Sequence, residues 1–428
     1  MMRVLLTNNT LRLRAGTELY VRDVALALVA RGHKPVAYST DLGEVAGELR
    51  AATIPVIDDL DALGEPPDLI HGQHHLDAMS AILRFPGVPA VYFCHGWLPW
   101  EEMPPRHPRI RRYVAVDALC RDRLVCEAGV APERVRLVLN FVDLVRFAPR
   151  REPLPALRPR RALVMSNAAS EGTFLPAVRE ACSRAGVATV DVAGEASGNV
   201  CARPEDILPG YDLVFAKARA ALEAMAVGAA VVLCDARGAG PLVTTDNLDE
   251  LRPLNFGVRT LRRPVSADAL AEEIARYDPA DAAALSARVR AEAGSEQAID
   301  RILEVYGEAM AAPETRDADD EARAAYRYLH AVSRGVKEAQ ALRPAFTRAE
   351  AEAERLRAEV AACHTHAGEL RTEVESLRAE RDLARADRAA LSRTTAVRLK
   401  DRLANGPALR LLRPLARRLA GLGDGGGP

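Results

Sequence analysis

Short hydrophobic runs recur along the first half of the chain, with helical patterns between them. Met2–Leu6 is an apolar run that ends in a polar loop. The segment after it is amphipathic, because Tyr20, Val24 and Leu28 recur at helical spacing. Gly32 ends that helix, and a second apolar run follows at 35–38. Strand, glycine-containing loop, helix and strand in this order predict the opening of a Rossmann-like domain.

The pattern breaks once and then starts again. Residues 150–161 are rich in proline and arginine and poor in apolar residues, as in a linker, and a new apolar strand begins at Arg161. Three further helices are predicted at about 267–276, 279–293 and 295–310. The predicted parts are a first Rossmann-like domain at 1–150, a linker at 151–160, a second Rossmann-like domain at 161–310, a helical segment at 311–404 and a basic tail at 405–428.

The most informative stretch is Leu213–Cys234, which is typical of a strand–helix–strand unit. In a parallel sheet, such a unit points the helix N-terminus at the carboxyl edge of the strands. Lys217 and Arg219 lie at that N-terminus, and Glu223 is the one carboxylate of an otherwise apolar helix. From the residues alone, Glu223 is either a solvated side chain on a core helix or a ligand-binding acid.

Residues Glu223–Val232 read Glu-Ala-Met-Ala-x-Gly-x-x-Val-Val, and this resembles the nucleotide-sugar signature of GT-B glycosyltransferases of the family-4 type. The segment 129–149 resembles the end of the first domain in that family, and the loop at Gly16 resembles its glycine-rich loop. The resemblance covers about 1–310. It implies a GT-B fold of two doubly wound parallel-sheet domains, with the acceptor on the first and the nucleotide-sugar donor on the second. It also implies transfer with retention, in surface polysaccharide, glycolipid or glycan synthesis.

The resemblance assigns Glu223 to the ribose of the donor. We further hypothesise that Lys217 and Arg219 bind its diphosphate, that Gly16 faces its phosphate or sugar, and that His95 contacts the sugar or the acceptor. Lys217 and His95 are the candidate catalytic residues. Further donor candidates are Ser166 and, in the glycine-rich loop that the resemblance implies after Cys234, Arg237 and Gly238. His71, His74 and Trp97 are candidates for the acceptor or the cleft lining.

The chain departs from the family pattern at several positions. Ala15 and Phe141 replace usual glycines, and Phe215 stands where the family often has a second glutamate. The usual arginine and lysine after the first strand of the second domain are missing. A catalytically silent scaffold or sugar-nucleotide-binding protein is therefore an alternative. A dehydrogenase is disfavoured, because the first loop lacks G-x-G-x-x-G.

Composition restricts the remaining classes. The net charge of -1 gives no argument for nucleic acid, and the seven cysteines form no CxxC pair, which fits a reducing cytosol. Three histidines at 71–75 lack the spacing and the carboxylates of a metal site, so no metal or other cofactor is expected. No signal peptide or membrane-spanning run is expected. The abundance of alanine and arginine indicates a GC-rich, bacterial source.

The last part of the chain predicts an interaction element. From Leu342 to Leu377, apolar or small residues recur in alternating steps of four and three, the heptad pattern of a coiled coil, and a parallel homodimer is the simplest arrangement. A single charged helix is the alternative. The segment 408–422 is basic and amphipathic, which is typical of binding to an anionic membrane surface. We therefore expect a cytoplasmic protein that is peripheral at the inner face of the plasma membrane, or a solvated tail.

Overall fold

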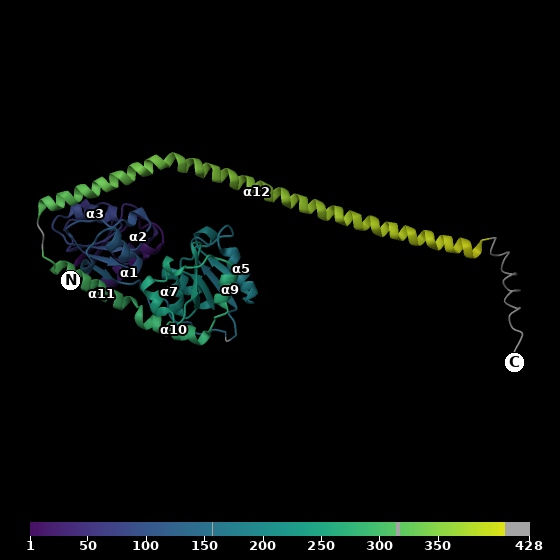
Figure 1. Ribbon diagram of the computed structural model, residues 1–428, viewed down its shortest axis with the longest axis horizontal. Coiled ribbons are helices and arrows are strands. Elements are labelled where there is room, and N and C mark those ends of the chain that lie inside the picture. The colour runs from purple at the N-terminus through teal and green to yellow at the C-terminus, as the bar shows by residue number, and fades with distance from the viewer. Residues whose placement is uncertain (156, 314–316, 407–428) are drawn as a thin grey trace. The chain divides into compact units, whose positions relative to one another are not determined.

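The computed structural model describes residues 1–155, 157–313 and 317–406 (Figure 1). The chain forms two compact units, Met1–Ala331 and Val332–Pro428. The first unit contains two parallel-sheet domains, and the second consists, in its described part, of one helix.

The first domain is built on a seven-stranded parallel sheet of order β3-β2-β1-β4-β5-β6-β7. The apolar runs of the sequence form its strands, which are buried along almost their whole length. The strands are β1 (Arg3–Thr7), β2 (Lys34–Tyr38), β3 (Val56–Ile57), β4 (Leu69–Gln73), β5 (Ala90–Cys94), β6 (Ile110–Ala115) and β7 (Val135–Leu137). The helices are α1 (Gly16–Ala30), α2 (Glu44–Ala51), α3 (His75–Arg84) and α4 (Ala118–Asp122).

The second domain has a five-stranded sheet of order β12-β11-β10-β8-β9, in which only β12 is antiparallel. Its strands are β8 (Arg161–Met165), β9 (Thr189–Ala193), β10 (Leu213–Ala216), β11 (Ala230–Asp235) and β12 (Gly238–Leu242). Its helices are α5 (Leu175–Arg184), α6 (Pro204–Ile207), α7 (Ala218–Val227), α8 (Leu248–Leu251), α9 (Ala267–Ile274) and α10 (Pro279–Glu292). The predicted strand–helix–strand unit is confirmed as β10, α7 and β11.

The helix α11 (Ser295–Ala311) follows the second domain along the chain but packs on the first. Ile299, Ile302 and Tyr306 are fully buried in the core of the first domain, together with strand residues of β1 and β4. Just before α11, Val142 and Gly294 form a parallel bridge. The last of the three predicted helices is thus confirmed, and the structure shows that it returns to the first domain.

One element differs from the expectation. The glycine-rich segment after Cys234 was interpreted as a loop, and this is wrong, because Gly238–Leu242 forms the edge strand β12. A Cβ atom on Gly240 would lie 2.6 Å from the carbonyl oxygen of Thr260. Its glycines therefore serve a close approach to the neighbouring chain segment, where Ala239 and Arg263 exchange backbone hydrogen bonds.

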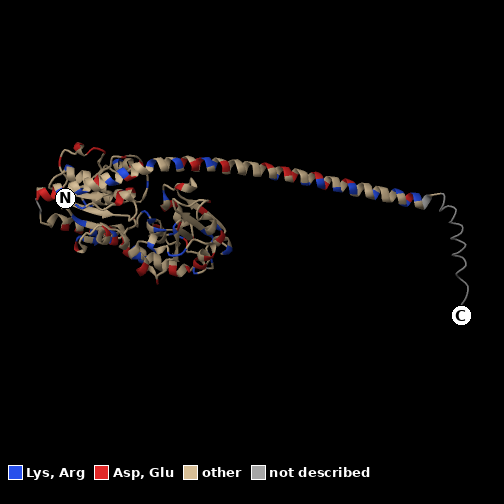
Figure 2. Cartoon of the chain, turned by 45° about the horizontal axis from the view of Figure 1, so that its top comes forward, with Lys and Arg blue, Asp and Glu red and all other residues tan. Residues whose placement is uncertain are grey.

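The helix α12 (Ala318–Asn405) confirms the predicted helical segment. Acidic and basic residues alternate along it (Figure 2). Its heptad positions are exposed, among them Leu342, Phe346, Leu356, Val360, Leu370, Val374 and Leu377. Their pairing with a second helix stays a prediction. No helix within the described ranges is long and apolar enough to cross a membrane. The basic amphipathic segment 408–422 lies outside the described residues.

Candidate functional site

The second sheet has a topological switch point between β8 and β10. From β8 the chain continues to β9 on one side, whereas β10 pairs with β8 on its other side. Open parallel sheets bind ligands in the crevice outside the carboxyl ends of such strands. Ser166 directly follows β8, and Lys217 directly follows β10. The sequence-predicted donor residues Ser166 and Lys217 therefore flank the position where this architecture places a ligand.

A buried aspartate joins these two residues. Asp235 ends β11, and its Oδ2 atom accepts a hydrogen bond from Ser166 Oγ at 3.2 Å and lies 3.3 Å from Lys217 Nζ. The Lys217 side chain keeps about a third of its surface exposed, at 33%. The loop after β9 packs tightly against Ser166, because a Cβ atom on Gly194 would lie 2.0 Å from Ser166 O. Asp235 was missed in the sequence, although a polar residue ending a buried strand could have pointed to it.

The N-terminus of α7 opens at the same edge. No side chain caps it, and its first residue, Ala218, has φ of 50°, a left-handed conformation that costs a non-glycine residue about 1 kcal/mol. The Ala218 N–H donates to Phe256 O at 2.8 Å, which holds this conformation. Strain of this kind is concentrated at functional sites. The uncapped N–H groups of the first turn can bind an anion.

Glu223 lies further along α7 and faces the first domain. Its Oε1 atom accepts a hydrogen bond from Arg219 Nε at 2.8 Å, and the Arg219 guanidinium also pairs with Asp23 of α1. Burial raises the pKa of Glu223, and Arg219 opposes this shift. Asp23 remains ionised, because Arg219 and Arg22 outweigh its burial and lower its pKa. Among the described residues, none donates to the second oxygen of Glu223, which leaves an acceptor for a ligand.

Arg219 is therefore engaged by two carboxylates. Burial disfavours its charge, but Asp23 and Glu223 prevail and raise the pKa of Arg219. Its charge is largely balanced, which leaves Lys217 as the more accessible cation of the predicted pair. Arg237 lies in the turn after the carboxyl end of β11, and Gly238 begins β12. Arg237 is exposed there. The structure thus places Ser166, Lys217, Arg237 and Gly238 at one edge.

The first sheet has its own switch point, between β1 and β4. Thr7 Oγ1 donates to Gln73 O at 3.0 Å and accepts from Gln73 N at 3.1 Å, which locks the two strand ends together. His74 follows β4 with φ of 55°, and its Nδ1 accepts a hydrogen bond from Asn9 N at 3.0 Å. His74 is buried, so it lies in the protein interior at this edge and not on an exposed cleft surface.

His95 follows β5 at the same edge. Its ring lies edge-on to Tyr20 of α1, with 4.5 Å between the ring centroids. Burial lowers the pKa of His95 to about 3, so the imidazole is neutral at physiological pH. The buried atoms His95 Nε2 and Tyr20 Oη have no hydrogen-bond partner among the described residues. Both can therefore serve a polar ligand such as a sugar hydroxyl.

Three other candidates take different positions. His71 is fully buried, stacks on Phe93 at 3.7 Å between centroids and hydrogen-bonds Tyr306 Oη, so its interpretation as a cleft residue is wrong and it is a core residue. Trp97 is 38% exposed in the loop after β5. Gly16 begins α1 with its surface exposed and open space around the position of a Cβ atom.

Glu102 is a further site residue that the sequence did not indicate. Its Oε2 atom accepts a hydrogen bond from His95 N at 3.1 Å, and its Oε1 atom lies 3.6 Å from His74 Nε2. Burial raises the pKa of Glu102 to about 7. A glutamate in an ordinary loop gives no sequence signal. Its importance arises because the fold returns this loop to His74 and His95.

Replacement of Glu102 by glutamine should change the pH dependence of stability. The pKa of Glu102 in the folded chain lies above its unfolded value of about 4.3. Protonation of Glu102 therefore stabilises the folded chain, and this contribution is fully present below about pH 4.3. This contribution is lost as pH rises towards 7. The free energy of unfolding of Glu102→Gln, relative to that of wild type, should be about 2–3 kcal/mol higher at pH 8 than at pH 5. Urea denaturation at both pH values measures this. Glu101→Gln is the control, and an equal gain in it would contradict the assignment.

No group of three or more histidine, cysteine, aspartate or glutamate side chains in the described part of the chain could hold a metal ion. His71 binds Tyr306 and Gln73, while His75 Nδ1 hydrogen-bonds Tyr328 Oη at 2.9 Å. The three histidines between 71 and 75 therefore point to separate partners.

The comparisons with known proteins agree with this architecture. Residues 14–146 match the family model described as Glycosyltransferase Family 4. A glycosyltransferase from Rickettsia africae is similar in structure, with 15% identity and a TM-score of 0.55 over 73% of this chain and 99% of that one. Anabaena Alr3699/HepE, solved with UDP and glucose, has 17% identity and a TM-score of 0.53 over 72% of this chain and all of that one. No match was found among curated protein sequences.

The chain has the GT-B fold, and residues 14–146 of its first domain are similar to the family model described as Glycosyltransferase Family 4. The resemblance drawn from the sequence is thereby confirmed. In this GT-B chain, the switch-point edge of the second domain and the histidine-lined edge of the first are the two halves of the candidate site. Asp23 of α1 and Arg219 of α7 connect them directly.

Proposed function

We propose that the chain is a glycosyltransferase that uses a nucleoside-diphosphate sugar as donor. The observation that carries this proposal is the grouping of Ser166, Lys217 and the uncapped N-terminus of α7 at the switch point of the second sheet. These groups match a diphosphate, and Glu223 presents a carboxylate oxygen for ribose hydroxyls about one turn further along α7. The Anabaena neighbour was solved with UDP, so UDP is the first donor nucleotide to test.

The proposed reaction breaks the bond between the anomeric carbon and the diphosphate oxygen and forms a bond to an acceptor hydroxyl. The leaving diphosphate takes the electron pair, and Lys217 together with the α7 N–H groups stabilises its growing charge. The leaving phosphate oxygen accepts the proton that the acceptor hydroxyl loses as the new bond forms. We propose that the anomeric configuration is retained, as the family resemblance implies. His95 and Tyr20 would bind sugar or acceptor hydroxyls from the first domain.

A panel of UDP-, GDP-, ADP- and dTDP-sugars tests this function. The matching donor should raise the melting temperature, because it binds only the folded chain. Slow hydrolysis of the same donor should release its nucleoside diphosphate. We propose that the reaction needs no metal, so EDTA should leave this release unchanged. A chain that is not stabilised by any member of the panel would contradict the proposal.

One observation favours a second candidate, a binding protein without catalysis. Lys217 is paired with Asp235, and Arg219 is paired with Asp23 and Glu223, so neither cation is free. Such a protein would show the melting-temperature shift with its sugar nucleotide but neither hydrolysis nor transfer. The panel therefore separates the two candidates. A transfer assay identifies whether the acceptor is a glycan, a lipid or a protein.

We also propose that α12 forms a homodimeric coiled coil. The helix α12 spans 88 residues, and a second helix that covers its row of exposed apolar side chains would stabilise it. Replacing Leu356 and Val360 by lysine should convert dimer to monomer, as sedimentation velocity would show. Lysine at the exposed positions Glu354 and Arg357, off the seam, is the control. A wild-type monomer would contradict the coil. Attachment to a membrane and a cytoplasmic location remain predictions from the sequence.

A further inference from the structure

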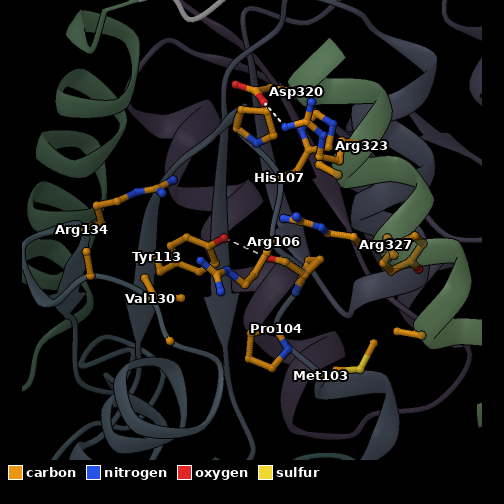
Figure 3. Close-up of a pocket in the computed structure, with 17 residues that line it drawn as sticks. Met103, Pro104, Arg106, His107, Tyr113, Val130, Arg134, Asp320, Arg323 and Arg327 are labelled. Carbon is orange, nitrogen blue, oxygen red and sulfur yellow. Dashed lines mark hydrogen bonds and ion pairs between the residues drawn. The ribbon is translucent and has the colours of Figure 1, made fainter. Parts of the chain in front are cut away.

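A separate pocket of about 530 Å³ opens on the first domain, against the first turns of α12 (Figure 3). One wall consists of 103–108, just before β6, and of 129–134, just before β7. The pocket therefore lies at the amino ends of these strands. His95 and Asp117 follow the carboxyl ends of β5 and β6, at the opposite edge of the same sheet. The pocket is thus not part of the donor and acceptor site.

The walls of this pocket are strongly cationic. Arginines from three segments line it, against a single carboxylate, Asp320. They are Arg106, Arg134, Arg323 and Arg327. Figure 3 shows Arg323 and Arg327 reaching in from α12, across from Arg106 and Arg134. Four positive charges against one negative charge leave an excess that the pocket itself does not neutralise.

The arginines are poorly paired within the protein. Arg323 lies 3.4 Å from Asp320, and Arg134 lies over the Tyr113 ring at 5.5 Å while it donates to a backbone carbonyl. Arg106 and Arg327 have no hydrogen bond or ion pair within the described ranges. Arg323 and Arg327 are also four residues apart on one face of α12, where like charges destabilise a helix. An anion between them would remove this repulsion.

His107 supplies an independent sign of a missing ligand. It is only 3% exposed and lines the pocket. Its Nδ1 atom accepts a hydrogen bond from Arg109 N at 3.3 Å, so the ring proton lies on Nε2. That buried Nε2 has no partner among the described residues. A buried donor without an acceptor is costly, and an anionic oxygen in the pocket would satisfy it.

We propose that this pocket binds a phosphate group, as a monoester or a diphosphate. Planar guanidinium groups match phosphate oxygens in pairs, and several of them converge here with the His107 N–H. The apolar lining by Met103, Pro104 and Val130 accommodates the less polar part of the same ligand. The phosphate belongs either to a metabolite in solution or to a lipid headgroup, and the two sources share this chemistry.

A bound phosphate would also fix the start of α12. This helix already docks on the first domain, because Tyr328 Oη donates to His75 O at 3.1 Å and Glu321 lies 3.1 Å from Arg109 Nε. The anion would add a connection from Arg323 and Arg327 to Arg106. Occupation of the pocket should therefore protect the amide hydrogens of residues 318–331 from exchange.

Titration calorimetry of the full chain with inorganic pyrophosphate tests the site, with Lys217→Ala as background to remove donor-site binding. In that background, pyrophosphate should still bind. Replacing both Arg323 and Arg327 by alanine should weaken pyrophosphate binding about tenfold or more, because hydrogen bonds to charged groups are stronger than those between neutral groups. Arg106→Gln, on the opposite wall, should weaken it as well. Arg334→Ala with Lys337→Ala, further along α12, is the matched control.

Vesicles of phosphatidylcholine with and without phosphatidic acid distinguish the two sources. Binding to the phosphatidic acid vesicles that is lost in Arg323→Ala with Arg327→Ala assigns the pocket to a lipid phosphate. Pyrophosphate binding without vesicle binding assigns it to a soluble ligand. The proposal is overturned if the Arg323 and Arg327 variant and Arg106→Gln both bind pyrophosphate as the Lys217→Ala parent does. Equal weakening in the Arg334 and Lys337 control would also overturn it.

Discussion

Lys217→Ala should lower donor affinity and the rate of transfer by about tenfold to a hundredfold, because a hydrogen bond from a cation to a phosphate contributes about 1.5–3 kcal/mol. The loss has a second component. Without Lys217, the buried carboxylate of Asp235 is left 3.2 Å from Ser166 Oγ with no cation beside it, and it would repel the diphosphate. Calorimetry with UDP, or with the donor found in the panel, measures the affinity.

A double variant separates these two components. Asp235→Asn removes the repelling charge, so Lys217→Ala with Asp235→Asn should recover part of the affinity that Lys217→Ala loses. Arg262→Ala is the matched control, because it removes a positive charge that is exposed on the same domain and paired with Glu250. Unchanged donor affinity in Lys217→Ala would contradict the diphosphate assignment.

Glu223→Gln should weaken UDP binding by up to about a hundredfold, because two ribose hydroxyls lose a charged acceptor. The effect on stability should be smaller. Arg219 keeps Asp23 as a partner after the change, so no uncompensated buried charge remains. Glu205→Gln is the control, since it removes another carboxylate of the second domain, one that is bound to Arg146 at 2.7 Å.

The ribose contact itself can be isolated with 2′-deoxy-UDP. Wild type should bind 2′-deoxy-UDP about tenfold more weakly than UDP, and this difference should vanish in Glu223→Gln. A comparison of this kind cancels any general damage to the fold, because both ligands are measured on the same variant. If Glu223→Gln preserved the full difference, the ribose would not be bound by this residue.

Much of the fold follows from local patterns. The apolar runs became parallel strands because sheets covered on both faces bury every residue of a strand, and the Glu223 motif formed the helix that the pattern indicated. The segment expected as a loop after Cys234 forms a strand, because its glycines allow close packing against 260–263. Glycine content alone does not distinguish a loop from a closely packed strand.

The candidate site was only partly predictable, because side-chain pairing depends on contacts between distant segments. Lys217 and Arg219 lie two residues apart, which suggested one cationic cluster. The structure instead pairs Lys217 with Asp235 and turns Arg219 towards Asp23, a residue of the other domain. Nothing near Asp23 in the sequence predicts that contact. His71 was misplaced for the same reason, since its partner Tyr306 follows more than two hundred positions later.

The central claim is that the carboxyl edge of the second sheet holds a nucleoside diphosphate. A crystal structure of the chain with UDP tests it most directly. We expect the diphosphate between Ser166, Lys217 and the first turn of α7, and the ribose hydroxyls within hydrogen-bond distance of the Glu223 carboxylate. UDP bound away from this edge, or with its ribose turned from Glu223, would contradict the account.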